Sequence, residues 1–340
     1  MVKIFSVFLF TFSILFSVFF FTDTAYSQDS QIKIRVLLVD PKNPVLPKKD
    51  EKLEKMDSKQ DAHVLVEGAK FSGKIDMYKG ERGIYVVNEM PLEDYLKGVI
   101  VAEVGSNWDA EALKAQAVAA RTYAIYQMQN ASRSVAGYHL TSSVLHQVYK
   151  SGSVPEAIFK AVDDTRSEVL TYEGKPIIAY YHSTSGGMTE DPIEVFGKEY
   201  PYLKAVETNS ELSPYFMWER KIPLAEVEKA LEISGIKDII VLSLTASSRL
   251  KDLKIVNTTK EVIILAKDFR RKIGWEKLPS TLITNMSIQD DRVVFEGRGY
   301  GHGVGLCQWS SLLMAKEGKT YREILQKFYP GAQIEHYAVQ

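Results

Sequence analysis

The run GVIVAEVGSNW, residues 98–108, places a single acid, Glu103, directly after an apolar stretch. An ionised carboxylate is costly to hold away from water, so a glutamate in such a setting is expected to have a raised pKa. A carboxyl that is still protonated near neutral pH can act as a general acid. A structural interpretation stands beside this one, in which Glu103 reaches solvent or pairs with Lys114 or Arg121.

Lys114 and Arg121 lie in the alanine-rich run EALKAQAVAARTYAIYQMQ, residues 111–129, which is typical of a helix. Small side chains let neighbouring backbones approach closely, so we expect this helix to be central in the fold. The two cations are seven residues apart and therefore share one helix face. Placed near Glu103, that face would offer a surface for a polar ligand.

A second group of candidate residues lies in HSTSGG, residues 182–187, after an expected strand. His182, Ser183 and Ser185 suit hydrogen bonding to sugar hydroxyl or acetamido groups, and equally suit simple loop capping. The run has no Gly-x-Ser-x-Gly elbow and no evident orienting acid, so a serine hydrolase is not favoured.

GRGYGHGVG, residues 297–305, precedes a helix that is expected to begin near Gln308. It lacks the Gly-Lys-Ser/Thr ending of a phosphate-binding P-loop. We interpret it as a wall with few side chains along which an extended ligand can lie, with Tyr300, His302 and Gln308 as contacts. Glycines needed only for turns are the alternative interpretation.

His139 and His146 form a further pair, but no third ligand stands in register with them, so no metal site is expected. Cys307 is the only cysteine, which excludes an intramolecular disulfide and a cysteine-rich zinc site. No cofactor is expected.

These residues require a scaffold of short strands with helices early and late in the chain, an order that favours an α+β fold rather than alternating βαβ units. The charged run 47–61 is interpreted as a solvated loop or an exposed helical insertion. A helix should begin at Pro91 and approach Glu103, and Asn107 or Asp109 should cap the next one. The other expected elements are strands at 32–39, 63–67, 83–87 and within 252–267, a hairpin at 168–181 and a helix at 222–233.

The 42 basic and 43 acidic residues nearly cancel, so charge gives no case for nucleic-acid binding. Residues 1–27 combine Lys3, an apolar stretch and a small-residue ending, as in a signal peptide. An uncleaved membrane anchor is the alternative, and only then would the chain contact a membrane. Either interpretation places the remainder outside the cytoplasm, in the periplasm, in the cell wall or secreted.

Three long motifs, within residues 91–124, 180–206 and 297–334, together resemble the SpoIID/LytB family of bacterial cell-wall remodelling proteins. The resemblance implies an α+β fold of mixed helices and antiparallel strands that form a substrate groove. On this basis residues 28–340 form one family domain. Its parts are a strand-rich start at 32–88, a catalytic helical core at 89–206 and a strand-rich part with the glycine motif at 207–340.

The resemblance implies that the protein is a peptidoglycan lytic transglycosylase that cleaves glycan strands stripped of their stem peptides. It also implies that Glu103 is the catalytic residue. The residues implied in substrate binding are Lys114, Arg121, His182, Ser183, Ser185, Tyr300, His302 and Gln308. His146 stands where some family members place a cysteine of a zinc site, so that metal is not expected here. Because other members enhance a cell-wall amidase, a noncatalytic enhancer or wall-binding module is the alternative.

Overall fold

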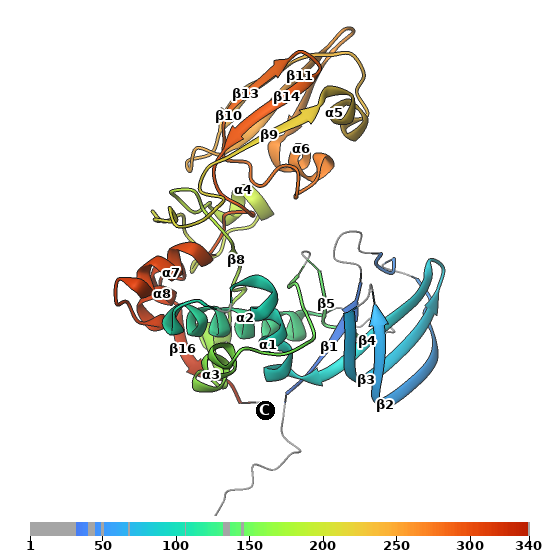
Figure 1. The fold of residues 1–340 in the computed structure, drawn as a ribbon, viewed down its shortest axis with the longest axis vertical. Coiled ribbons are helices and arrows are strands. Elements are labelled where there is room, and N and C mark those ends of the chain that lie inside the picture. Colours follow the sequence, from blue (N-terminus) through green and yellow to red (C-terminus); the bar gives the residue numbers. More distant parts are fainter. Residues whose placement is uncertain are drawn as a thin grey trace, which may run out of the picture. The chain divides into compact units, whose positions relative to one another are not determined.

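The computed structural model describes residues 32–39, 45–48, 51–66, 69–105, 107–131, 137–143 and 146–338, and the expected signal segment 1–27 lies outside them. The chain from Ile32 to Gln340 forms one compact unit. Its described residues form helices α1–α8 and several sheets whose strands pair mainly antiparallel, which confirms the α+β prediction (Figure 1). None of the described helices is both long enough and apolar enough to cross a membrane.

The N-terminal sheet has the strand order β2-β3-β4-β1-β5. The interpretation of 47–61 as a loop or a helical insertion is wrong from Glu54 onward, because this stretch belongs to edge strand β2 and pairs with β3. Most β2 side chains are exposed, so alternation carries no signal there and charged residues are tolerated. The strands are β1 (Lys33–Leu38), β2 (Glu54–Val66), β3 (Ala69–Gly80), β4 (Gly83–Pro91) and β5 (Leu140–Thr141).

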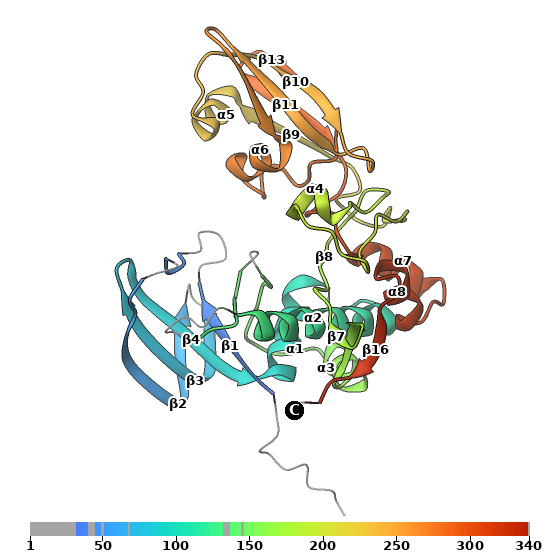
Figure 2. The ribbon, with the colours of Figure 1, turned by 180° about the vertical axis from the view of Figure 1, so that it is seen from behind.

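Two helices follow the sheet, as predicted: α1 (Leu92–Glu103) begins after Pro91, and α2 (Ala110–Asn130) is capped by the Asp109 side chain. Helix α2 packs against α1, α3, α7 and α8, which surround it in Figures 1 and 2. One face of α2 belongs to the hydrophobic cluster that contains α1, and another face belongs to the cluster that contains α7 and α8. Its alanines permit this close packing. The partner helices are α3 (Glu156–Asp164), α7 (Gln308–Lys316) and α8 (Tyr321–Phe328).

The segment after α3 joins distant parts of the chain. The predicted hairpin is confirmed by the pairing of β6 with β7, whose turn residues Glu173 and Gly174 have φ values of 51° and 71°. Strand β8 then pairs parallel with β15, which directly precedes α7. The elements are β6 (Glu168–Tyr172), β7 (Lys175–Pro176), β8 (Tyr181–His182), α4 (Pro192–Phe196), β15 (Leu306–Cys307) and β16 (Gln333–His336).

Residues 218–297, called the sheet module below, have a hydrophobic cluster of their own. The first and last strands of the module are neighbours, with Trp218 opposite Gly297. The predicted helix at 222–233 and the predicted strand pair within 252–267 are both confirmed here. The elements are β9 (Trp218–Pro223), α5 (Leu224–Leu231), β10 (Ile236–Leu244), β11 (Leu250–Asn257), β12 (Glu261–Leu265), α6 (Ala266–Ile273), β13 (Ile283–Gln289) and β14 (Arg292–Gly297).

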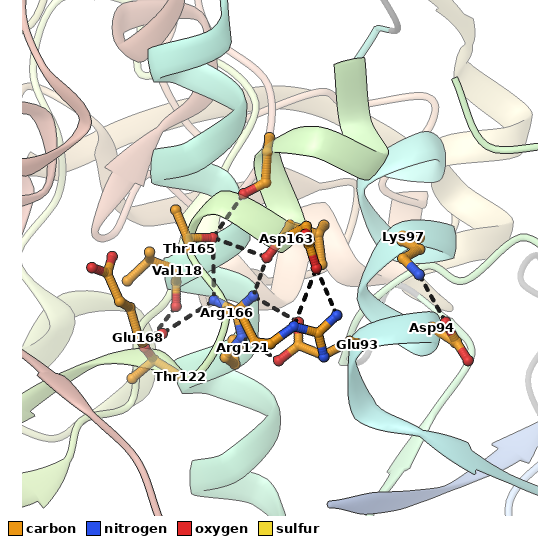
Figure 3. A network of polar contacts seen from close by, with 12 residues as sticks. Glu93, Asp94, Lys97, Val118, Arg121, Thr122, Asp163, Thr165, Arg166 and Glu168 are labelled. Carbon is orange, nitrogen blue, oxygen red and sulfur yellow. Dashed lines mark hydrogen bonds and ion pairs between the residues drawn. The ribbon is translucent and has the colours of Figure 1, made fainter. Parts of the chain in front are cut away.

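A buried arginine ties three helical elements together (Figure 3). The Arg121 side chain of α2 is 0% exposed, and its Nε and Nη2 donate to the Glu93 carboxylate of α1 at 2.9 and 2.7 Å. The same guanidinium donates to the carbonyls of Val162 and Glu168, both at 3.1 Å. Every donor nitrogen of Arg121 therefore has an internal acceptor, and the charge is paired, as a buried charge must be.

We predict that Arg121→Ala lowers the free energy of unfolding by about 3–5 kcal/mol, because Glu93 loses its partner and two carbonyls lose their donor. Chemical denaturation measures this change. The matched control is Arg166→Ala, since the Arg166–Asp163 pair has the same 2.7 Å separation but side chains that are 42% and 52% exposed. Its expected loss is below about 1 kcal/mol. Equal losses in the two variants would contradict a structural role for Arg121.

Candidate functional site

Glu103 is the last residue of α1 and is partly buried. Burial raises the pKa of its carboxyl to about 7. Its position also disfavours a negative charge, because the C-terminal end of a helix is the negative end of the helix dipole. The Val148 backbone N–H donates to Glu103 Oε1 at 3.1 Å and opposes the shift. Near neutral pH both the acid and the carboxylate are therefore populated.

Gly98 allows the chain segment that carries Val148 to lie against α1. A Cβ atom at Gly98 would come within 2.4 Å of the Tyr149 ring and of the Lys150 carbonyl. The Lys150 N–H donates to the Gly98 carbonyl at 3.3 Å, which fixes the segment on the helix. One small residue, a little more than one turn before Glu103, thus permits the contact that holds the carboxyl in place.

Gln308 reaches Glu103 from the opposite end of the chain. It is the first residue of α7 and is buried, and its side chain favours the charged form of Glu103. Gly305 permits this approach: its φ is +72°, and a Cβ atom there would lie 2.0 Å from the Tyr180 carbonyl oxygen. The pairing of β8 with β15 depends on that close approach. Gln308 Nε2 is buried and makes no well-formed hydrogen bond within the described residues, and Gln308 is not among the residues that line the cavity described below.

The glycine-rich segment 297–305 packs mainly against the chain itself. Cβ atoms at Gly299 and Gly301 would collide with residues 182–185, and both glycines have positive φ. These two glycines therefore serve close packing of the chain against residues 182–185 as well as backbone angles that favour glycine. Gly301 and His302 nevertheless line a cavity, so part of the expected wall faces open space.

Glu103 does not itself line that cavity, but its charge acts on two tyrosines that do. Tyr181 and Tyr300 both line it, and the charge of Glu103 contributes to the raised pKa of each, after the larger effect of burial. Both phenols are consequently protonated at neutral pH. The buried Tyr181 hydroxyl has no well-formed partner among the described residues and is available as a donor.

The cavity has a volume of about 580 Å³ and contains both apolar and charged walls. Tyr180 and Phe196 stack with their ring centres 4.2 Å apart, and His302 meets both rings edge-on. Side chains of α6 form the charged wall. The residues that line the cavity include His146, Tyr180, Tyr181, Phe196, Lys267, Asp268, Arg270, Arg271, Trp275, Tyr300 and His302.

His182 and His302 lie together, with ring centres 5.6 Å apart, and both are neutral near pH 7. Burial lowers the pKa of His302 to about 3 and that of His182 well below its usual range. His182 Nδ1 bonds the Val304 carbonyl at 3.1 Å, which leaves its buried Nε2 without a partner in the described structure. His302 lines the cavity and can meet a ligand there, whereas His182 is buried and is not among the lining residues; neither ring supplies a proton at neutral pH.

The two predicted serines hold the loops in place. Ser183 contacts the Thr184 hydroxyl at 3.2 Å, and its carbonyl accepts from the Trp309 N–H at 3.1 Å. Ser185 is fully buried and bonds Thr208 and Cys307. Ser185 therefore supports the site from behind and does not face the cavity.

The expectation that Lys114 and Arg121 form a cationic surface near Glu103 needs correction. Arg121 is enclosed and fully paired, as described above, because α2 is covered by helices on several sides. Lys114 pairs with Glu111 at 2.9 Å and with Asp164 at 3.7 Å. Within the described residues, neither cation forms an ion pair with Glu103. The two side chains do share a helix face, but that face is directed at neighbouring helices.

His139 and His146 do not form a pair either. His139 Nδ1 accepts from the Arg35 N–H at 3.1 Å, and His146 Nδ1 lies 3.0 Å from the Thr141 hydroxyl. Across the described parts of the chain, no three His, Cys, Asp or Glu side chains gather around one point.

Sequence reasoning missed Tyr181, Val148 and the charged side chains of α6. The aromatic pair before His182 was a visible signal for Tyr181. Val148 acts through its backbone, and α6 lies about 160 residues from Glu103 along the chain, so no local pattern points to either.

Two family models match two different regions of the chain, and both regions contribute residues to this cavity. A family model described as "Stage II sporulation protein" matches residues 80–172, which contain α1, α2 and Glu103. A second model, "Domain of unknown function (DUF8618)", matches residues 198–305, which contain the sheet module.

Among similar proteins, an uncharacterized protein of Brachyspira hyodysenteriae is 34% identical over 288 residues, which is 82% of this chain and 75% of that protein. Stage II sporulation protein D of Bacillus subtilis is 32% identical over 270 residues, covering 73% of this chain and 75% of its own length. The amidase enhancer of Bacillus subtilis is 28% identical, with 71% of this chain and 40% of that protein aligned. From these matches, which extend well beyond Glu103 on both sides, we conclude that the chain belongs to the SpoIID/LytB family.

Proposed function

We propose that this protein is an exported lytic transglycosylase that cleaves bonds between N-acetylmuramic acid and N-acetylglucosamine in peptidoglycan strands without stem peptides. The observation that carries the proposal is Glu103, a partly buried carboxyl with a pKa of about 7 that is held by the Val148 N–H and whose charge acts on two tyrosines of the cavity. Relatives named for sporulation and for amidase enhancement support a role in the cell wall.

A single carboxyl that changes protonation state is sufficient for this reaction. Protonated Glu103 gives its proton to the glycosidic oxygen as the bond to C1 of the muramoyl residue breaks. The resulting carboxylate takes the proton of the muramoyl C6 hydroxyl while that oxygen bonds to C1, which closes a 1,6-anhydro ring. The proton returns to Glu103 and no water is consumed.

The cavity fits a reaction with one catalytic carboxyl. Hydrolysis with a second carboxylate requires that group free to activate water or to attack the sugar. Glu103 itself is not among the described residues that line the cavity; Asp268 is the carboxylate that lines it, and it is paired with Arg271 at 2.9 Å. Tyr181 lines the cavity, and its hydroxyl, which has no well-formed partner among the described residues, is the donor that we assign to a sugar oxygen.

The second candidate function is a noncatalytic enhancer of a cell-wall amidase, favoured by the similarity to a protein of that name. An enhancer would raise the turnover of an added amidase and bind purified wall without cleaving glycan. In that case Glu103→Gln would leave the stimulation unchanged.

We predict that Glu103→Gln lowers the yield of anhydromuramoyl products from strands without stem peptides by at least about 100-fold, because an amide can neither give nor take the proton. Chromatography with mass spectrometry of the digest measures the yield. Glu156→Gln, at an exposed acid of α3, is the control and should retain full activity. An unchanged yield with Glu103→Gln would remove this residue from the mechanism.

We also predict a pH-dependent stability difference between Glu103→Gln and the parent protein. The pKa of Glu103 rises from 4.5 to about 7 on folding, so the folded state binds more protons than the unfolded state between these values. Stability of the parent protein is therefore lost as pH rises through this window, by about 1–3 kcal/mol. Denaturation should show the variant more stable at pH 8 and no such gain at pH 4. A difference independent of pH would contradict the raised pKa.

A further inference from the structure

Helix α6 of the sheet module presents a cationic wall to the cavity. Ala266, Phe269 and Ile273 are buried in the module's hydrophobic cluster, so the helix directs its other side chains away from that core. Lys267 and Arg271 are four residues apart, lie on the same helix face, and both line the cavity. Both are exposed, so their charges are accessible to a ligand.

The charges of this wall do not cancel. Lys267 Nζ donates to the Val195 carbonyl at 3.1 Å and makes no ion pair with a described residue. Arg270 donates to the carbonyls of Leu278 and Pro279, and its pKa of about 10 leaves it charged at neutral pH. Asp268 is the acid among the lining residues and pairs with Arg271. Three cations therefore face the cavity with one carboxylate, and the wall attracts anions.

Aromatic rings beside this wall suit a sugar. Phe196 and Trp275 line the same cavity, with 39% and 37% of their surfaces exposed. Exposed rings next to polar groups pack against the apolar face of a pyranose, while the polar groups bind its substituents. A ring surface next to a cationic wall fits a sugar that carries a carboxylate better than a neutral one.

The wall is fastened to the loops of the site. Lys267 binds the last turn of α4 through Val195, and the Gly301 N–H donates to the Pro279 carbonyl at 3.0 Å. Lys251 of the module pairs with Glu194 of α4 at 2.9 Å. The cations are thus held near His302 and Phe196 by direct contacts.

We propose that Lys267 and Arg271 of α6 bind the lactyl carboxylate of a muramic acid residue and so select glycan strands in which that carboxylate is free. This inference rests on the proposed function for its substrate. It assigns to α6 the binding of a polar ligand that the sequence predicts for Lys114 and Arg121. An amide bond to a stem peptide removes this charge from the lactyl group, so hydrolysis of that amide must precede tight binding.

Binding is measured by calorimetry with the Glu103→Gln protein, which prevents turnover. The two probes are a peptide-free (GlcNAc–MurNAc) oligomer and a chito-oligosaccharide of equal length, which lacks the carboxylate. The double variant Lys267→Ala/Arg271→Ala should weaken binding of the anionic oligomer at least about tenfold and change binding of the neutral one less than about twofold. Asp268→Asn should strengthen binding of the anionic oligomer, because it frees Arg271.

Lys272→Ala is the matched control, since Lys272 is an exposed cation of α6 that is not among the residues lining the cavity. It should leave the affinity for both oligomers unchanged. Equal losses for the two probes in the double variant, or no loss for the anionic one, would overturn the proposal. Cleavage by the parent protein is measured separately: carboxylate-selective binding without cleavage would refute the transglycosylase and retain the role of α6.

Discussion

Enclosure of α2 is the constraint on which the rest of the structure depends. The helix contacts two hydrophobic clusters, and its alanines keep the backbones of its neighbours close. The charged side chain of Arg121, buried on this helix, is paired internally with Glu93 and two backbone carbonyls. This arrangement fixes the first turn of α1 against α2, and Glu103 lies at the other end of the same helix.

The chemistry proposed for Glu103 rests on a balance of opposing effects. Burial favours the neutral acid, while the Val148 N–H and the Gln308 side chain favour the carboxylate. If burial acted alone, the pKa of the carboxyl would be higher still, and the group would give up its proton less readily as an acid. With stronger hydrogen bonding it would stay ionised and would be a poor acid. The observed balance places the pKa where one group can perform both steps.

The local elements could be predicted from the sequence, because turn residues, caps and apolar periodicity are local signals. Helices α1 and α2, the hairpin at Glu173 and Gly174, and the start of α7 at Gln308 are examples. The predicted strand at 63–67 coincides with the end of β2, where side chains alternate, but the earlier part of β2 was missed because most of its side chains are exposed and show no alternation. The orientation of Lys114 and Arg121 was missed because helical spacing identifies a shared face but not the neighbour that covers it. The α6 wall depends on contacts between distant segments.

The parallel pairing of β8 with β15 has a consequence for the order of folding. It joins Tyr181 to Leu306, and closing so long a flexible loop carries an entropic cost that grows with the number of free residues. The sheet module lies within that loop, and its first and last strands are neighbours, with Trp218 opposite Gly297. Once the module has folded, its residues no longer lengthen the loop. If the module folds first, loop closure costs less entropy, and we expect the contacts that bring Gln308 to Glu103 to form after those within the module.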